Sequence, residues 1–306
     1  MPSAHRTLAT ARRRRKGLLP HEDDGRLYAS TSYWNTPIPA NPQIDPNSTN
    51  MVNTSLVAYG SGANLMNSLN WGNPLVYSGN DDPVRTITCD RYCPYGTTTT
   101  FRIPAGIQPS GGSDHHLAVI NRDTGQELDM YQARLNGSNW VAGSFVKLDS
   151  NGVGACGVPG TRCLGTTAAG FANIGGAVMI RDIKRGSINH ALAFTTPKNR
   201  ANYTVCPATG SDGASTDPNS LPEAARIQLN PTFDVGAQSW PAWKKMIATA
   251  LQTYGAYNRD NGGTIGVVAE NPIHYPSGIW SQVGVTSSGL SDLPWSQMRV
   301  LTMTQC

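Results

Sequence analysis

The sequence predicts a mainly β protein, an antiparallel β-sandwich of jelly-roll type with one amphipathic helix and short peripheral helices. Composition is the first reason: 14% of residues are charged, whereas 32 are glycine and 21 are proline, which favours strands, turns and ordered loops over a helical bundle. The second reason is that beyond residue 75 apolar residues alternate with polar ones or form short runs bounded by glycine and proline. Strands are expected at residues 75–78, 84–89, 99–103, 115–121, 126–132, 140–148, 177–181, 188–196 and 265–269.

Residues 1–27 show no hydrophobic periodicity, so we expect a disordered basic tail there and a single domain at 28–306. Six basic residues and no acidic residue lie within residues 1–16, and this segment accounts for the formal net charge of +4. The rest of the chain carries 18 basic and 20 acidic residues, which gives no reason to expect a nucleic-acid partner. Because no run of 18 apolar residues occurs, no membrane span is expected.

The first ordered elements are expected to be a proline-rich segment and a short helix. Residues 33–39 hold an aromatic pair and two prolines, which suits a rigid segment that crosses a sheet. Trp34 in this segment could stack on a sugar ring, although a tryptophan beside prolines more often anchors a loop to the core. Asp45 and Pro46 have the order of a helix N-cap and first turn, and apolar residues up to Tyr59 form a partial stripe.

Residues 114–133 are the most informative stretch, because they predict a hairpin that carries carboxylates, histidines and a phenol. Residues 123–125 (Asp-Thr-Gly) fit a three-residue loop with a left-handed glycine, which pairs Arg122 with Gln126. A four-residue loop would instead place His116 beside the carboxylates. In the three-residue register, the polar face is expected to hold His115, Leu117, Val119, Asn121, Glu127, Asp129 and Tyr131.

A second stretch resembles the first strand of this hairpin. Residues 189–194 (Asn-His-Ala-Leu-Ala-Phe) align with residues 114–119 (Asp-His-His-Leu-Ala-Val), so that His190 takes the position of His115. Neighbouring strands in this phase would present both histidines at one end of a sheet.

Two further elements complete the expected domain. Residues 207–222 contain glycines and prolines and predict a long loop, and long loops in compact domains are often functional. An amphipathic helix is expected at about 240–254, with Ser239 as its N-cap and Gly255 as its stop. Its apolar stripe has helical spacing and consists of Trp243, Ile247, Ala250, Leu251 and Tyr254.

Six cysteines favour an oxidising compartment, and therefore a secreted, extracellular protein. The expected disulfides pair near neighbours: Cys89 with Cys93, Cys156 with Cys163, and Cys206 with Cys306. A zinc site is the alternative, but the usual Cys-x-x-Cys ligand spacing is absent. A recognisable signal peptide is also absent, because residues 17–24 after the basic run have no apolar core.

Glu127 and Asp129 are the first candidates for catalysis. They lie two positions apart on one strand, so their side chains share a face and their Cα atoms are separated by roughly 6.5–7 Å. Paired carboxylates at this reach suit glycosidic cleavage, with one as acid and the other as nucleophile or base. The alternative is that alternating acids simply cover an exposed sheet face.

Residues 127–132 (Glu-Leu-Asp-Met-Tyr-Gln) resemble the Glu-x-Asp-x-x-Glu strand of the laminarinase-like jelly-roll hydrolases, glycoside hydrolase family 16. The resemblance covers these six residues and implies that Glu127 is the nucleophile and Asp129 its helper. Gln132 stands where that family has its acid/base glutamate, and an amide cannot donate the proton that the family's mechanism requires.

Histidine and tyrosine side chains allow a second chemistry, that of a polysaccharide lyase. His115 or His190 would remove the proton α to a uronate carboxylate, and Tyr131 would protonate the leaving oxygen. A bound metal is not expected, because adjacent His115 and His116 point to opposite faces of a strand. The side chains available to neutralise the uronate are Asn189, Gln132 and Arg134.

The sequence therefore predicts a secreted, carbohydrate-active enzyme that needs no cofactor and cleaves a polysaccharide, by hydrolysis first and by elimination second. Glu127, Asp129, His115 and His190 are the predicted catalytic residues. The alternative is a non-catalytic glycan-binding or adhesion module of cell-wall or phage-tail type. The remaining side chains expected to contact the glycan are His116, Tyr131, Gln132, Arg134, Asn189, Trp34 and Trp71.

Overall fold

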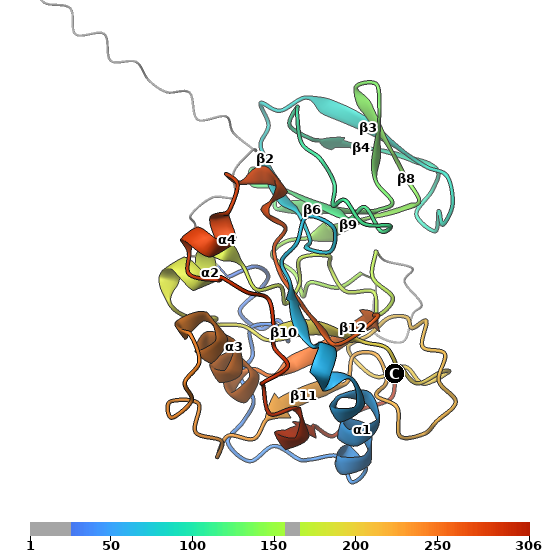
Figure 1. Ribbon diagram of the computed structural model, residues 1–306. Coiled ribbons are helices and arrows are strands. Elements are labelled where there is room, and N and C mark those ends of the chain that lie inside the picture. Colours follow the sequence, from blue (N-terminus) through green and yellow to red (C-terminus); the bar gives the residue numbers. More distant parts are fainter. Residues whose placement is uncertain (1–25, 157–165) are drawn as a thin grey trace, which may run out of the picture.

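The computed structural model describes residues 26–156 and 166–306, and within them the protein is mainly β, with three mixed sheets (Figure 1). The six-stranded sheet has the order β1 (Asn64–Met66), β13 (Gly266–Val268), β10 (Leu192–Thr196), β12 (Ala256–Asn261), β11 (Arg226–Leu229) and β14 (Met298–Val300). The middle sheet has the order β2 (Leu75–Ser78), β5 (Leu117–Asn121), β6 (Gln126–Tyr131) and β9 (Ser144–Asp149). The outer sheet has the order β4 (Thr98–Arg102), β3 (Val84–Cys89), β8 (Asn139–Ala142) and β7 (Arg134–Asn136).

The sheets stack as layers, which is consistent with the predicted sandwich. Figure 1 shows the outer sheet at one end, the middle sheet next to it, and the six-stranded sheet with its helices at the other end. Parallel pairs such as β2–β5 and β10–β12 occur among the antiparallel ones. The chain passes through the outer sheet between β2 and β5, and through β11 and α3 (Ala242–Thr253) between β10 and β12. Antiparallel pairs are nevertheless the majority among the described strands, as the prediction of a mainly antiparallel sandwich requires, whereas jelly-roll connectivity stays a prediction.

The middle sheet is buried on both faces. Leu117, Leu128 and Met130 pack against the outer sheet, whereas Ala118 and Ile120 pack toward the six-stranded sheet. Every residue of β5 is consequently buried. At the centre of β6, polar side chains are removed from water as well, and this burial determines the environment of the two central carboxylates.

Short helices cover the far face of the six-stranded sheet. The predicted amphipathic helix is confirmed as α3 (Ala242–Thr253), although Pro241 rather than Ser239 occupies its N-cap position. The early helix is confirmed as α1 (Ser48–Ser55). Residues 177–181 are not a strand, because Val178 makes only an isolated bridge before α2 begins. The other helical elements are η1 (Val57–Gly62), α2 (Ile180–Arg185), η2 (Pro272–His274), α4 (Ile279–Gln282) and η3 (Trp295–Gln297).

The hairpin at 114–133 forms, but in the register of the four-residue loop. Asn121 pairs with Gln126 and Ala118 pairs with Asp129, so the predicted pairing of Arg122 with Gln126 is wrong. Asn121 explains the longer loop, because its side-chain Oδ1 accepts hydrogen bonds from the backbone amides of Asp123 and Thr124. His116, and not His115, therefore shares a face with the carboxylates.

Two of the three predicted disulfides are confirmed, Cys89–Cys93 and Cys206–Cys306. Cys163 lies outside the described residues, so its pairing with Cys156 stays a prediction. Residues 1–25 of the predicted basic tail also lie outside them. Within the described part of the chain, no helix has both the length and the apolar character needed to cross a bilayer.

Candidate functional site

A cleft of about 610 Å³ opens between the six-stranded sheet and the entrance to β5. Its walls are the end of β12 with the turn that follows, β1 with residues 67–73, and Asp114 with His116. We call this the central cleft. Trp71, which is 49% exposed, gives the lining an indole surface. Much of the remaining lining is polar and carries carboxamide side chains, those of Asn64, Asn67, Asn70, Asn73 and Asn261.

His116 lies at the inner wall of the central cleft. Its backbone amide donates to Ser110 Oγ at 2.8 Å, its side chain is buried, and its Nδ1 has no hydrogen-bond partner among the described residues. Burial and the nearby Arg259 guanidinium lower the pKa of His116 to about 4. The imidazole is therefore neutral at neutral pH. Its residue lines the cleft, whereas its Nδ1 is buried and unpartnered within the described part of the chain.

Tyr131 lies beside this histidine at the end of β6. The two rings have centroids 5.7 Å apart, and Tyr131 is partly exposed. Partial burial and the carboxylate of Asp114 raise the pKa of Tyr131, so the phenol keeps its proton. The backbone turns at Gln132, which has a positive φ of 52°, and the Gln132 amide donates to Asp114 O at 2.7 Å, fixing Asp114 at the cleft.

Arg259 connects the central cleft with the interior. It comes from β12, is only 3% exposed, and donates through Nη1 to Asn173 O at 2.8 Å. Burial lowers the pKa of Arg259, and Asp260, Asp129 and Asp114 act against that shift. A guanidinium held by surrounding carboxylates stays charged, so the cleft contains one fixed cation.

Glu127 and Asp129 are fully buried, at 0% exposure, so the prediction that they line a solvent-reaching cleft is wrong. Burial and the Asp129 carboxylate raise the pKa of Glu127 well above its usual range, and burial raises the pKa of Asp129 to about 7. The two carboxyl groups act on each other in the core, where burial side by side favours a proton on one of them. Tyr28 Oη donates to Glu127 Oε1 at 3.3 Å, and the Asn173 amide donates to Asp129 Oδ2 at 2.7 Å.

The predicted convergence of His115 and His190 with these carboxylates is also not found. His115 has a positive φ of 41°, and its Nδ1 lies 2.8 Å from Ser110 O. His190 Nε2 lies 3.2 Å from Asp182 Oδ2. His190 and Asn189 line a separate small cavity beside Arg181. The similarity of residues 189–194 to 114–119 therefore does not bring the two histidines into one site.

The other predicted contact residues fall into different surroundings. Trp34 is 1% exposed and packs in an aromatic cluster with Phe171 and Tyr257, which confirms the anchoring alternative. Arg134 is exposed and pairs with Asp90. Trp71 and His116 are the predicted contact residues that line the central cleft.

Sequence reasoning missed Arg259, Asp260 and the asparagines of residues 64–73. The asparagines recur at every third position, but such a period has no meaning until the segment is known to border a cleft. Arg259 and Asp260 follow three buried residues of β12. Asp260 also belongs to a group of carboxylates with the spacing of a metal site, together with Asp212 and Glu223.

Comparison of the chain with protein-family models, curated proteins and solved structures found no match. The resemblance of residues 127–132 to glycoside hydrolase family 16 therefore stays a prediction from sequence.

Proposed function

We propose that this protein is a secreted enzyme that binds a uronate-containing polysaccharide in the central cleft and cleaves it by elimination. One observation carries the proposal: a neutral histidine, His116, lines a large polar cleft together with Arg259, and the Tyr131 ring lies 5.7 Å from the His116 ring. The two disulfides are compatible with an extracellular location.

The lining of the cleft suits a sugar chain. Exposed Trp71 offers an aromatic face on which a pyranose ring can stack, and the asparagine amides can both donate to and accept from hydroxyl groups. The volume is within the range typical of ligand sites. Arg259 supplies a cation for a uronate carboxylate, a group that Arg binds through paired hydrogen bonds.

Elimination would proceed by two proton transfers. The His116 imidazole removes the proton α to the uronate carboxylate while Arg259 stabilises the negative charge that develops on that carboxylate. Tyr131 Oη protonates the glycosidic oxygen, the bond to that oxygen breaks, and a carbon–carbon double bond forms in the uronate. Asp114 stabilises the resulting imidazolium, since its carboxylate raises the pKa of His116.

Hydrolysis is the second candidate, now with different residues. Asp114 and Asp260 both line the central cleft, so they can reach a sugar that Glu127 and Asp129 cannot. A pair of carboxylates flanking a glycosidic bond is the usual requirement for hydrolysis.

A panel of neutral and acidic polysaccharides tests the proposal. We expect new reducing ends together with ultraviolet absorbance of unsaturated uronates, from acidic glycans alone. Tyr131→Phe, which removes the phenol beside His116, is expected to cut that rate by about 10²-fold or more. Tyr203→Phe serves as the control, because this tyrosine packs against Arg200 and is neither in the lining of the central cleft nor among the groups that act on Tyr131. Reducing ends without absorbance would favour hydrolysis, and binding without either product would favour a glycan-binding module.

A further inference from the structure

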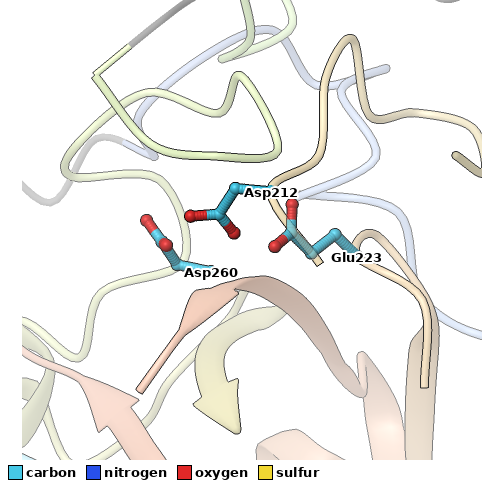
Figure 2. Close-up of side chains that lie close together, drawn as sticks. All are labelled: Asp212, Glu223 and Asp260. Carbon is cyan, nitrogen blue, oxygen red and sulfur yellow. The ribbon is translucent and has the colours of Figure 1, made fainter. Parts of the chain in front are cut away.

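Three carboxylates from separate parts of the chain meet next to the central cleft. Asp212 comes from the long loop after β10, Glu223 precedes β11, and Asp260 lies near the end of β12. One ligand oxygen from each of the three lies within 4.8 Å of those from the other two. Figure 2 shows the three side chains pointing toward one another.

The surrounding backbone holds these carboxylates in place. Asn261 Nδ2 donates to Asp212 Oδ1 at 2.5 Å and to Asp212 O at 3.2 Å. Asp260 accepts hydrogen bonds from the amides of Ala168 and Asn261. Ala224, directly after Glu223, adopts a positive φ of 65° and donates to Asn258 O at 2.6 Å. The cluster is therefore held in place: Glu223 is buried, Asp260 accepts hydrogen bonds from two backbone amides, and the exposed Asp212 is bound by Asn261.

Glu223 supplies a separate reason to expect a ligand here. Its side chain is 0% exposed, and its Oε2 has no hydrogen-bond partner within residues 26–156 and 166–306. The other oxygen, Oε1, receives one long hydrogen bond of 3.5 Å from Asn199 Nδ2. Leaving a buried carboxylate oxygen without a donor or a cation is costly.

The charges around Glu223 increase this cost. The ligand oxygens of Asp212 and Asp260 lie within 4.8 Å of that of Glu223. Among the described residues, no basic side chain forms an ion pair with Glu223. Carboxylates crowded together in this way require either protons or a positive ion.

We propose that Asp212, Glu223 and Asp260 form a binding site for one Ca²⁺ ion at the border of the central cleft. Ca²⁺ takes oxygen ligands at about 2.3–2.6 Å, so two oxygens on one ion lie at most about 5 Å apart. The cluster satisfies this limit, and its ligands are hard, anionic oxygens with no thiolate or imidazole. Asp212 is exposed and gives the ion an entry path, and water completes the coordination.

The site does not depend on the proposed glycan cleavage. Asp260 also lines the central cleft, so a bound ion would neutralise negative charge at the wall where an acidic sugar is proposed to lie. A failure of calcium binding leaves the elimination chemistry of His116 untouched, and the reverse also holds.

Calcium titration of the EDTA-treated full chain, by calorimetry and by thermal unfolding, tests the site. We expect one Ca²⁺ per chain with a dissociation constant of about 10⁻⁵ to 10⁻³ M and a melting temperature that rises with calcium. Glu223→Gln and Asp212→Asn should each weaken binding at least about tenfold. Asp217→Asn is the matched control, because Asp217 lies in the same loop, pairs with Lys198, and stands outside the cluster.

Glu223→Gln should fold, because an amide of the same shape replaces a buried acid that lacks a cation. If circular dichroism shows that Glu223→Gln does not fold, calcium binding by the Asp212→Asn variant, which changes an exposed side chain, tests the site instead. Unchanged calcium binding in the folded variants, equal loss in Asp217→Asn, or no binding by the wild type up to about 10 mM would overturn the site. Tighter binding of Mg²⁺ than of Ca²⁺ would overturn the choice of ion.

Discussion

Ala118 pairs with Asp129 across the β5–β6 hairpin, and this register places His116 on the same face as both buried carboxylates. A shift of one residue would have turned His115 toward them instead. The register therefore decides which histidine borders the central cleft. It also leaves Glu127 and Asp129 behind that cleft, between two sheets.

Glu127→Gln is predicted to keep turnover within about threefold of wild type, because Glu127 is fully buried and cannot touch a substrate. The amide can donate to Asp129 in place of the shared proton, so the fold should survive. Steady-state rates on the glycan that the panel identifies provide the measurement. A loss of about 10²-fold with an unchanged melting temperature would restore the carboxylate mechanism predicted from sequence.

The two tryptophans predicted to contact glycan should behave differently. Trp71→Ala is expected to weaken polysaccharide binding by about tenfold, the scale of one lost stacking contact, with little change in stability because the ring is half exposed. Trp34→Ala is expected to lower the free energy of unfolding by about 3–5 kcal/mol, because the ring fills a core. Affinity electrophoresis and chemical denaturation separate the two effects. The reverse pattern would contradict the assignment of the cleft.

Glu270 should make stability depend on pH. Burial raises the pKa of this carboxyl from 4.5 to about 7, and the Asp182 carboxylate adds to the increase. Hydrogen bonds from the Ile180 amide and Tyr275 Oη, together with the nearby Arg181 guanidinium, limit the increase. A raised pKa means that the folded state binds the proton more tightly than the unfolded state. The stability that protonated Glu270 contributes is therefore fully present below pH 4.5 and is lost as pH rises through about 7.

Glu270→Gln removes the loss of stability that accompanies ionisation of Glu270 at rising pH. The amide can accept from Ile180 and donate to Tyr275 Oη, so relative to wild type the variant should gain up to about 3 kcal/mol between pH 4.5 and pH 8. Denaturant titrations at several pH values measure the difference. A difference that does not change with pH would contradict the raised pKa.

The fold elements with strong local signals were predictable from sequence. The stripe of α3 has helical spacing over three turns, so its position followed directly, and the glycine- and proline-bounded runs located β2, β3, β5 and β6. The Cys89–Cys93 pairing was predictable on the same local grounds, because the two cysteines are four positions apart. The predicted length of the hairpin loop was wrong. An Asn121 side chain can stabilise a four-residue turn as well as a left-handed glycine can stabilise a three-residue turn.

The candidate site was less predictable because it depends on contacts between distant residues. Glu127 and Asp129 alternate as an exposed strand would, and only the covering of β6 by layers on both faces reveals that they are buried. Trp71, His116 and Arg259 come from three separate segments that meet only in the folded chain. The indole of Trp71 and the imidazole of His116 mark these residues as candidate glycan contacts, whereas nothing local distinguishes Arg259 from other arginines.

The Cys206–Cys306 disulfide closes a loop with a sequence separation of 100. Cys306→Ser is predicted to lower the free energy of unfolding by about 3–5 kcal/mol, since long loops lose the most entropy on closure. Urea denaturation measures this change. Thiol titration of unfolded, unreduced wild type should find no free thiol, and a free thiol there would remove the main support for secretion.

The most direct test of the proposed elimination compares His116→Gln with His115→Asn. Glutamine cannot act as a base, whereas asparagine tolerates the left-handed backbone of residue 115 and can donate to Ser110 O. The measurement is the initial rate of unsaturated-uronate absorbance from an acidic polysaccharide. If His116 is the base, the rate should fall by about 10²-fold or more for His116→Gln and stay within about threefold of wild type for His115→Asn. Full activity in a folded His116→Gln variant, or equal losses in both, would contradict this role of His116.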